Sequence, residues 1–289
     1  MVKLYSYGKI NLFLDIEGKL PNGYHLIKTV MQSIDLHDKI SIENLDKNEI
    51  IIKCNDPAIP INEKNTCYKA ASIIKETYHK TQGVIIEIEK KIPSEAGLAG
   101  GSSNSAAVIH GLNKLWNLNM STESMLEIGL KVGADVPFCI IGGTYLAEGI
   151  GEKLTKLNDF VWSDILIIKP DFSMSTAFVY KNLSSDSYHS FKENNILNYI
   201  NSGNFNEAAS SVSNTLEHVV AKFNPELNDI KKLLIDSGAA TSLMTGSGSA
   251  VFGLFADSAS LNEAYEKISP LYPKTFKTRT VQKGVQILD

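Results

Sequence analysis

The stretch from residue 93 to residue 107, PSEAGLAGGSSNSAA, constrains the fold of this chain more than any other. The run 84–90 before it alternates apolar with charged residues, as a half-buried strand does, and Pro93 ends that run because proline cannot donate to a sheet. The run 109–116 after it repeats apolar residues at helical spacing. The sequence therefore predicts a strand, a loop and a helix, and the loop contains three glycines that allow tight turns and close approach to a ligand: Gly97, Gly100 and Gly101.

A loop of this kind suits a phosphate group. The first turn of a helix has about four backbone N–H groups without partners, and the helix dipole is positive there. Many glycine-rich loops are plain connectors, however. This one has neither the lysine of a P-loop nor the G-x-G-x-x-G spacing of a dinucleotide fold, so a phosphate site here would belong to neither class.

Composition limits the partners of the chain. The net charge is −4 and no basic tract is present, which argues against a nucleic-acid partner. Arg279 is the only arginine, so backbone amides and lysines would have to bind any phosphate. No apolar run is long enough to span a membrane and no signal-peptide core follows Met1, so we expect a cytoplasmic protein. The three cysteines are too widely spaced to indicate a zinc site or a disulfide framework.

The first strand is predicted over residues 4–16. Its even-numbered residues from Ile10 to Ile16 are apolar and share one face, which places Lys9 and Asn11 on the other face. A lysine beside an apolar stripe usually just reaches solvent. The turn KLPNGYH follows at 19–25 and ends in an aromatic ring and an imidazole, Tyr24 and His25, which could be packing residues or could stack on and hydrogen-bond a base.

The rest of the first half contains predicted strands over 33–42 and 49–53 and helices over 65–78 and 121–133. The sequence GADVPF comes next. Because Pro137 biases Val136 towards an extended backbone, we expect Asp135 in a short joint between a helix and a strand. A single aspartate after a helix is usually a turn residue, but this one stands between apolar segments.

The length of the whole chain, 289 residues, favours two domains, and the second half reads as a separate unit. Its predicted strands cover 164–169, 241–244, 251–256 and 275–281, and its predicted helices cover 176–183, 195–200, 206–212, 226–237 and 261–268. Strand, helix, strand, strand, helix, strand is the order of a ferredoxin-like α+β domain. The glycines of the loop TGSGSA indicate, by themselves, only a tight turn.

Three motifs, GKINLFL, PSEAGLAGGSSNSAA and MTGSGSAVFGLF, follow one another along the chain. This order resembles the GHMP kinase superfamily, which includes galactokinase, homoserine kinase and mevalonate kinase. The pairing of PNGYH with GADVPF resembles the family within it that acts on 4-diphosphocytidyl-2-C-methyl-D-erythritol in non-mevalonate isoprenoid biosynthesis. The resemblance implies an α+β fold with an N-terminal ribosomal-protein-S5-domain-2-like domain over 1–158 and a C-terminal ferredoxin-like domain over 159–289. It also allows the last strand to return to the domain junction.

The resemblance further implies a role for each matching residue. Lys9 and Asp135 match the catalytic pair, and Asn65 matches a position near the adenine. The ATP phosphates would lie on the glycine-rich loop, that is Pro93, Ser94, Glu95, Ala96, Gly97, Leu98, Ala99, Gly100, Gly101, Ser102 and Ser103. The residues that match substrate contacts are Asn11, Tyr24, His25, Thr176, Tyr180, Gly246 and Ser247.

The implied reaction is ATP-dependent phosphorylation of the substrate 2-hydroxyl, with Mg²⁺ accompanying ATP and its protein ligands left unassigned. The implied partners are ATP and the cytidyl substrate, with no nucleic acid and no membrane, and the implied assembly is a monomer or weak homodimer. Tyr24 and His25 would stack on and hydrogen-bond the cytosine, with Tyr180 on the other side of that ring.

Three departures from the family pattern are visible. Lys19 and Leu20 stand where an arginine is common, and Glu95 puts a carboxylate inside the phosphate loop. Thr66 and Cys67 follow Asn65 where larger aliphatic residues are usual, which affects the expected adenine pocket.

Two other functions compete with this interpretation. One is another small-molecule kinase of the superfamily, of the homoserine or mevalonate type, and the other is a nucleotide sensor without catalysis. The GYH turn and Tyr180 disfavour the first, because a substrate without a base needs no aromatic pair. Lys9 and Asp135 together disfavour the second, because a sensor needs neither.

Overall fold

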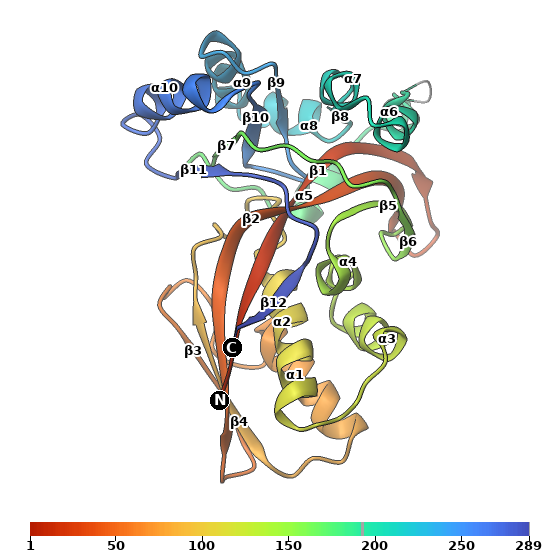
Figure 1. Cartoon of the computed structure of the whole chain (residues 1–289). Helices are drawn as coiled ribbons and strands as arrows, with labels where there is room; N and C mark the ends of the chain where they lie inside the picture. Colours follow the sequence, from red (N-terminus) through yellow and green to blue (C-terminus); the bar gives the residue numbers. More distant parts are fainter. Residues whose placement is uncertain (192–193, 289) are drawn as a thin grey trace.

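Two β-sheets, one built mainly from each half of the chain, organise the fold (Figure 1). The structure is a computed structural model and describes residues 1–191 and 194–288. Within those residues the first sheet has eight strands and the second has four, and helices pack against both. The predicted α+β fold is therefore confirmed.

The first sheet is built around a long hairpin of β1 (Val2–Lys19) and β2 (His25–Leu45). Its main strand order is β12-β1-β2-β4-β3, with β3 at Ile50–Cys54, β4 at Gly83–Glu89 and β12 at Val285–Leu288. Three shorter strands extend it: β5 (Thr144–Gly149) pairs with β2, β6 (Lys153–Lys156) with β5, and β8 (Ser213–Asn214) with β1.

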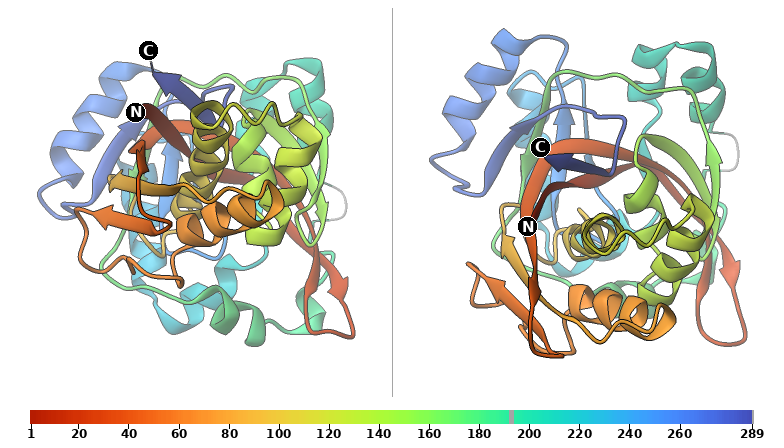
Figure 2. Two further views of the ribbon diagram at one scale, coloured as in Figure 1. Left: turned by 90° about the horizontal axis from the view of Figure 1, so that it is seen from below. Right: turned by 60° about the horizontal axis from the view of Figure 1, so that its bottom comes forward.

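The helices of the first half bury their apolar faces against this sheet (Figure 2). They are α1 (Thr66–Thr77), α2 (Gly100–Leu115), α3 (Thr122–Val132) and α4 (Val136–Ile141). Helix α2 is the central one, since it contacts α1, α3 and α4 as well as β1 and β2. Its buried residues Ala106, Val108 and Ile109 have small or branched side chains, which allow this close packing.

The second sheet has the order β11-β7-β10-β9 and is antiparallel throughout. Its strands are β7 (Ile165–Ile168), β9 (Thr241–Met244), β10 (Val251–Leu254) and β11 (Thr275–Thr278). Helices α9 (Glu226–Asp236) and α10 (Ser258–Ile268) complete the predicted ferredoxin-like arrangement. Four shorter helices and one 3₁₀ turn lie between β7 and α9: α5 (Thr176–Lys181), η1 (Ser185–Ser187), α6 (Ile196–Ser202), α7 (Phe205–Ser210) and α8 (Glu217–Phe223).

Strand β1 connects the two halves, and in Figure 1 it runs with β2 from the lower half into the upper one. Leu4 belongs to the core under α1 and α2, Ile10 to a central core, and Ile16 to the core under α9 and α10. An 18-residue strand is roughly 60 Å long, so it can reach all three. The last strand, β12, pairs with the beginning of β1, and both chain ends therefore lie together (Figure 2).

One local prediction is wrong. The sequence GADVPF predicts a strand after Asp135, but helix α4 begins at Val136 and the next strand begins only at Thr144. Pro137 lies in the first turn of α4, where a helix needs no N–H from it and where its fixed φ is favourable.

Candidate active site

A cavity of about 1160 Å³ lies where the three motifs meet. It is large for a single small ligand, because such pockets typically measure about 300–1,000 Å³. The glycine-rich loop, the β1–β2 turn, the GADVPF segment, α5 and the loop after β9 all contribute to its lining. All predicted site residues except Ser103 line this cavity.

Ser103 is the exception because its side chain points away from the cavity. Its hydroxyl donates to the carbonyl oxygen of Tyr7 at 2.6 Å, and the residue is fully buried. The structure therefore does not bring Ser103 to the loop surface with Ser102, and its hydroxyl ties α2 to β1.

The glycine-rich loop adopts a backbone that leaves the start of α2 open. Glu95, Gly97 and Ala99 all have positive φ, and Ala99 stands at the N-cap position of α2. Alanine has no side-chain oxygen that could cap the free N–H groups of the first helical turn. Those N–H groups and the positive end of the helix dipole remain available to an anion in the cavity.

The loop after β9 holds the glycine-rich loop in place. The backbone N–H groups of Ser249 and Ala250 donate to the carbonyl oxygens of Glu95 and Ala96 at 3.3 and 3.2 Å. Contact at Gly97 is so close that an added Cβ would overlap the carbonyl oxygen of Thr245. Glycine is therefore required at 97 both for its φ of +72° and for this contact.

Lys9 is a buried cation at an irregularity in β1. The pairing with β2 is interrupted between Tyr7 and Lys9, and the Lys9 backbone N–H donates to Leu98 of the loop instead. The Lys9 Nζ donates to Asn11 Oδ1 at 2.6 Å and to the Gly97 carbonyl oxygen at 2.8 Å. Burial lowers the pKa of Lys9, and the charge of Asp135 partly opposes that shift.

Asp135 lies 3.9 Å from the Lys9 ammonium group, measured from Oδ2 to Nζ. The two side chains differ in exposure, since Lys9 is 4% exposed and Asp135 is 35% exposed. Asp135 occupies the N-cap position of α4, yet its carboxylate forms no capping hydrogen bond. The carboxylate is therefore free to receive a proton from a ligand, while the lysine behind it fixes a positive charge.

Aromatic residues also line the cavity. Tyr24, at the tip of the β1–β2 hairpin, is 60% exposed, whereas His25 is buried. The His25 ring lies 5.1 Å from that of Tyr180 at an angle of 35°, and Tyr188 approaches its edge at 6.0 Å. Burial, and secondarily the charge of Lys19, lowers the pKa of His25, so its imidazole is neutral at pH 7.

Helix α5 and the loop after β9 are also linked directly. The hydroxyl groups of Thr176 on α5 and Ser247 on the loop after β9 lie 2.8 Å apart. Asn11 accepts from Lys9 and donates through Nδ2 to Thr29 Oγ1 at 2.8 Å. Gly246 is packed against this group, because a Cβ there would lie 3.2 Å from the Lys9 Nζ.

Asn65 and its neighbours have structural contacts of their own. Asn65 caps α1 by accepting from the Cys67 N–H at 2.8 Å, and its amide donates to the Pro60 carbonyl oxygen at 2.7 Å. Thr66 donates to the Gly101 carbonyl oxygen at 3.1 Å, which connects α1 to the start of α2. Burial raises the pKa of Cys67 to about 12, so this thiol stays protonated.

Sequence reasoning missed three residues that support the site. Asn214 donates to the carbonyl oxygens of Met244 and Gly246, both at 2.8 Å, and so fixes the loop after β9. Asp38 and Lys90 form an ion pair beside the glycine-rich loop. No periodic pattern marks these positions, because each acts through a partner far away in the sequence.

No group of three or more His, Cys, Asp or Glu side chains that could hold a metal ion occurs in residues 1–191 and 194–288. Glu95, Asp135 and Ser102 supply oxygen atoms to the cavity lining. Over the same residues, no helix is both long and apolar enough to cross a membrane.

Family models match both halves of the chain. The model of the GHMP kinases N terminal domain matches residues 65–143, and that of the GHMP kinases C terminal matches residues 194–274. A crystal structure of homoserine kinase from Cytophaga hutchinsonii superposes with a TM-score of 0.80 at 19% identity, over 99% of this chain and 97% of that one. The chain therefore belongs to the GHMP kinases and is an ATP-dependent small-molecule kinase.

Sequence relatives narrow the assignment. A 4-diphosphocytidyl-2-C-methyl-D-erythritol kinase of Clostridium botulinum is 44% identical over 97% of this chain and 100% of its own length. The enzyme of that name from Clostridioides difficile is 42% identical over 99% of this chain and 97% of its own. A crystal structure of 4-(cytidine 5'-diphospho)-2C-methyl-D-erythritol kinase has a TM-score of 0.81 at 27% identity, over 96% of this chain and 98% of that one. Within the GHMP kinases, the chain belongs to the 4-diphosphocytidyl-2-C-methyl-D-erythritol kinase family.

Proposed function

We propose that this protein transfers the terminal phosphoryl group of ATP to the 2-hydroxyl of 4-diphosphocytidyl-2-C-methyl-D-erythritol. The observation that carries the proposal is the arrangement of one cavity. It is lined by an open helix N-terminus, by the aromatic residues Tyr24, His25 and Tyr180, and by Lys9 with Asp135. The helix N-terminus suits a triphosphate, and the aromatic residues suit a cytosine base.

Asp135 is the proposed base. Its carboxylate would accept the proton of the 2-hydroxyl while the hydroxyl oxygen forms a bond to the γ-phosphorus and the bond to the ADP oxygen breaks. A base positioned on such a proton contributes typically about 10² to 10⁴ in rate. Lys9 would stabilise negative charge on the attacking oxygen and on the transferring group, which is how most phosphoryl-transfer catalysis is achieved.

Mg²⁺ is part of the proposal because ATP phosphates need their charge offset during transfer. The cavity oxygens able to hold it are those of Glu95, Asp135 and Ser102. The Ser103 hydroxyl does not face the cavity, since it donates a hydrogen bond to the Tyr7 carbonyl oxygen. When bound, the ion would offset negative charge on the phosphate oxygens.

The cytosine would bind at the hairpin tip. A neutral imidazole has one N–H donor and one acceptor nitrogen, which can match the mixed donor and acceptor edge of a base. The exposed ring of Tyr24 offers a stacking surface that needs no rearrangement of the core. The fold alone does not select this substrate, because the homoserine kinase structure matches it almost as well.

The test is ADP release from Mg-ATP with the cytidyl alcohol, measured for the wild-type protein and for Asp135→Asn. We expect turnover with this alcohol, none with homoserine or mevalonate, and a fall in kcat of about 10²-fold or more in the variant. Turnover with little effect of Asp135→Asn would make Asp135 a positioning residue. ATP binding without turnover of this alcohol would overturn the substrate assignment and favour a sensor.

A cytoplasmic location and a monomer or weak homodimer stay predictions from the sequence. The domain boundary at residue 158 is also a prediction, and the path of β1 through both halves bears on how independent the two domains are.

A further inference from the structure

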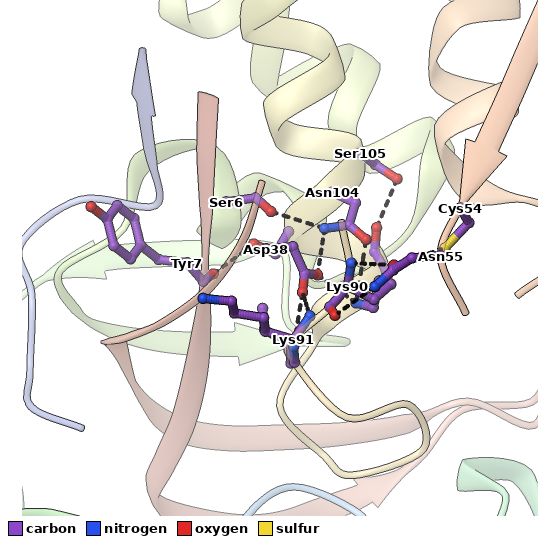
Figure 3. Close-up of polar contacts among 12 residues, drawn as sticks. Ser6, Tyr7, Asp38, Cys54, Asn55, Lys90, Lys91, Asn104 and Ser105 are labelled. Atoms are coloured by element: carbon purple, nitrogen blue, oxygen red, sulfur yellow. Dashed lines mark hydrogen bonds and ion pairs between the residues drawn. The ribbon is translucent and has the colours of Figure 1, made fainter. Parts of the chain in front are cut away.

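A buried polar cluster lies beside the glycine-rich loop (Figure 3). Its centre is Asp38 on β2, whose side chain is 0% exposed and forms an ion pair with Lys90, whose side chain is 6% exposed. Lys90 follows directly after β4, and it also lines the cavity. The cluster therefore reaches from the interior of the sheet to the wall of the site.

Asp38 uses both of its carboxylate oxygens. One oxygen, Oδ1, accepts from the backbone N–H groups of Lys91 at 2.6 Å and Ile92 at 2.8 Å. The other, Oδ2, accepts from the Lys90 ammonium group and from the Asn104 side-chain amide, the latter at 2.7 Å. A single carboxylate thus accepts from four donors. Figure 3 shows Asp38 with Lys90, Lys91 and Asn104 around it.

These donors flank the loop on both sides. Lys90, Lys91 and Ile92 immediately precede the loop at Pro93, whereas Asn104 lies on α2 directly after it. Asn104 is fixed in turn, since its amide also donates to Ser6 Oγ on β1 at 2.8 Å. Asp38 therefore connects the entrance and the exit of the loop to each other.

Lys90 also closes the space under the start of α2. A Cβ at Gly100 would lie 2.9 Å from the Lys90 Nζ, so the ammonium group is packed against the first residue of the helix. That residue carries one of the N–H groups proposed to meet the phosphates. A displacement of Lys90 would change the position of these N–H groups directly.

Stability alone is a weak reason for such a pair. Removing two charges from water is costly, and replacing a buried ion pair by apolar residues is often neutral or even stabilising. The geometric effect is specific, however, because four hydrogen bonds to one rigid carboxylate define where both flanks of the loop lie.

We propose that Asp38, through Lys90, Asn104 and the backbone of residues 91–92, is a positioning residue that sets the phosphate loop for nucleotide binding. This inference rests on the proposed binding of ATP by residues 93–102. Its consequence is a selective one: loss of the cluster weakens ATP binding and leaves the binding of the alcohol substrate nearly unchanged.

The main test uses a double variant, Asp38→Asn with Lys90→Met, which removes both charges and leaves none of them buried alone. The readouts are the Kd of Mg-ATP by calorimetry, the KM for each substrate, and the melting temperature without ligand. We expect the Kd and KM for ATP to rise about tenfold to a hundredfold, because small misplacements of binding groups have effects of this size. The KM for the alcohol should stay within about twofold, since Tyr24 and His25 are not connected to the cluster.

The matched control is a neighbouring ion pair on β2 and β4. Lys39 and Glu89 are neighbours of Asp38 and Lys90 in the chain, are directly paired across β2 and β4, and form an exposed ion pair of 3.5 Å. The double variant Lys39→Met with Glu89→Gln should leave the Kd and both KM values unchanged. An equal rise of the ATP Kd in this control would overturn the inference.

A gentler variant, Asn104→Ala, keeps both charges and removes only the contact on the α2 side. It should raise the ATP Kd several-fold, and it replaces the double variant if the latter loses its near-ultraviolet circular dichroism. An unchanged ATP Kd in a folded variant, with only the melting temperature lowered, would reduce the cluster to a structural role. Because calorimetry needs no turnover, a wild-type protein that binds ATP without phosphorylating the alcohol would refute the proposed function and leave this inference testable.

Discussion

At the scale of single residues, the site depends on unequal exposure of neighbouring groups. Lys9 is enclosed and donates to two neutral oxygens, on Asn11 and Gly97, so its position is fixed before any ligand arrives. Asp135, 3.9 Å away, faces the cavity with an uncommitted carboxylate. A fixed cation behind a reachable base is an arrangement suited to taking a proton and stabilising the oxygen left behind.

His25 gives a prediction about pH. Burial holds the pKa of His25 below its ordinary value of 6.5, so the ring is neutral at pH 7 and becomes charged only as the pH falls through that lowered pKa. A protonated imidazole has two donors and no acceptor. We therefore expect the KM for the cytidyl substrate to rise on the acid side of that pKa, while the KM for ATP stays flat over the same range.

The comparison variant is His25→Gln, whose amide has a donor and an acceptor but does not titrate. Its KM for the cytidyl substrate should be higher than that of the wild type and independent of pH in this range. If the acid rise persists in His25→Gln, another group causes it, and the role proposed for His25 is wrong.

At the scale of elements, the glycine-rich loop is shaped by contact between the two halves of the chain. Gly97 has positive φ and touches Thr245 so closely that no side chain fits. Gly101, four residues later, lies within α2, and an added Cβ would meet only the Thr66 hydroxyl at 3.5 Å, an ordinary contact. The two glycines of one motif therefore have different reasons to be there.

This contrast predicts opposite effects of the same substitution on stability. Gly97→Ala should lower the free energy of unfolding by about 2–4 kcal/mol, from backbone strain together with overpacking against Thr245. Gly101→Ala should be neutral or stabilising by up to about 1 kcal/mol, because alanine is favoured over glycine in a helix. Urea denaturation of both variants measures the difference, and equal destabilisation would show that the Thr245 contact is not limiting.

Local signals in the sequence predict many of the helices and strands. Alternating apolar residues predicted β4, helical spacing predicted α1 and α3, and Ser121 and Gly133 correctly mark the ends of α3. The strand predicted after Asp135 failed because a proline signal is ambiguous: it disfavours a helix before it and favours the first turn of one. Asp38 could not be recognised, since its four partners lie more than 50 residues away and leave no local pattern.

At the scale of the whole molecule, the two halves share structure rather than merely touching. Strand β1 contributes to the cores of both, β8 from the second half pairs with β1, and β12 returns to the first sheet. Asp15 on β1 is buried and accepts from the Thr215 hydroxyl at 2.7 Å and from the Phe191 N–H at 3.1 Å. Length and motif order predicted two domains, but no local feature of the sequence could show that one strand serves both, because strand pairing between distant segments is decided by tertiary packing.

This sharing predicts that the chain unfolds as one unit. Proteins with two domains often show two calorimetric transitions, each with its own midpoint. Here neither core can be lost without freeing part of β1, so we expect a single transition whose calorimetric and van't Hoff enthalpies agree. Leu14→Ala, in the part of β1 buried against the second half, should lower that one midpoint, at a cost of about 2–5 kcal/mol, without splitting it.

Leu130→Ala is the matched control, since Leu130 is an exposed leucine on α3 and its removal should hardly move the midpoint. Two resolved transitions in the wild type, or a Leu14→Ala scan in which only one of two peaks shifts, would mean that the halves unfold independently. In that case the shared strand would be a connector between two self-sufficient domains, and closure of the cavity would depend on their relative motion. A single transition would instead mean that the glycine-rich loop, the Lys9–Asp135 pair and the aromatic residues of the cavity are held together by one cooperative unit.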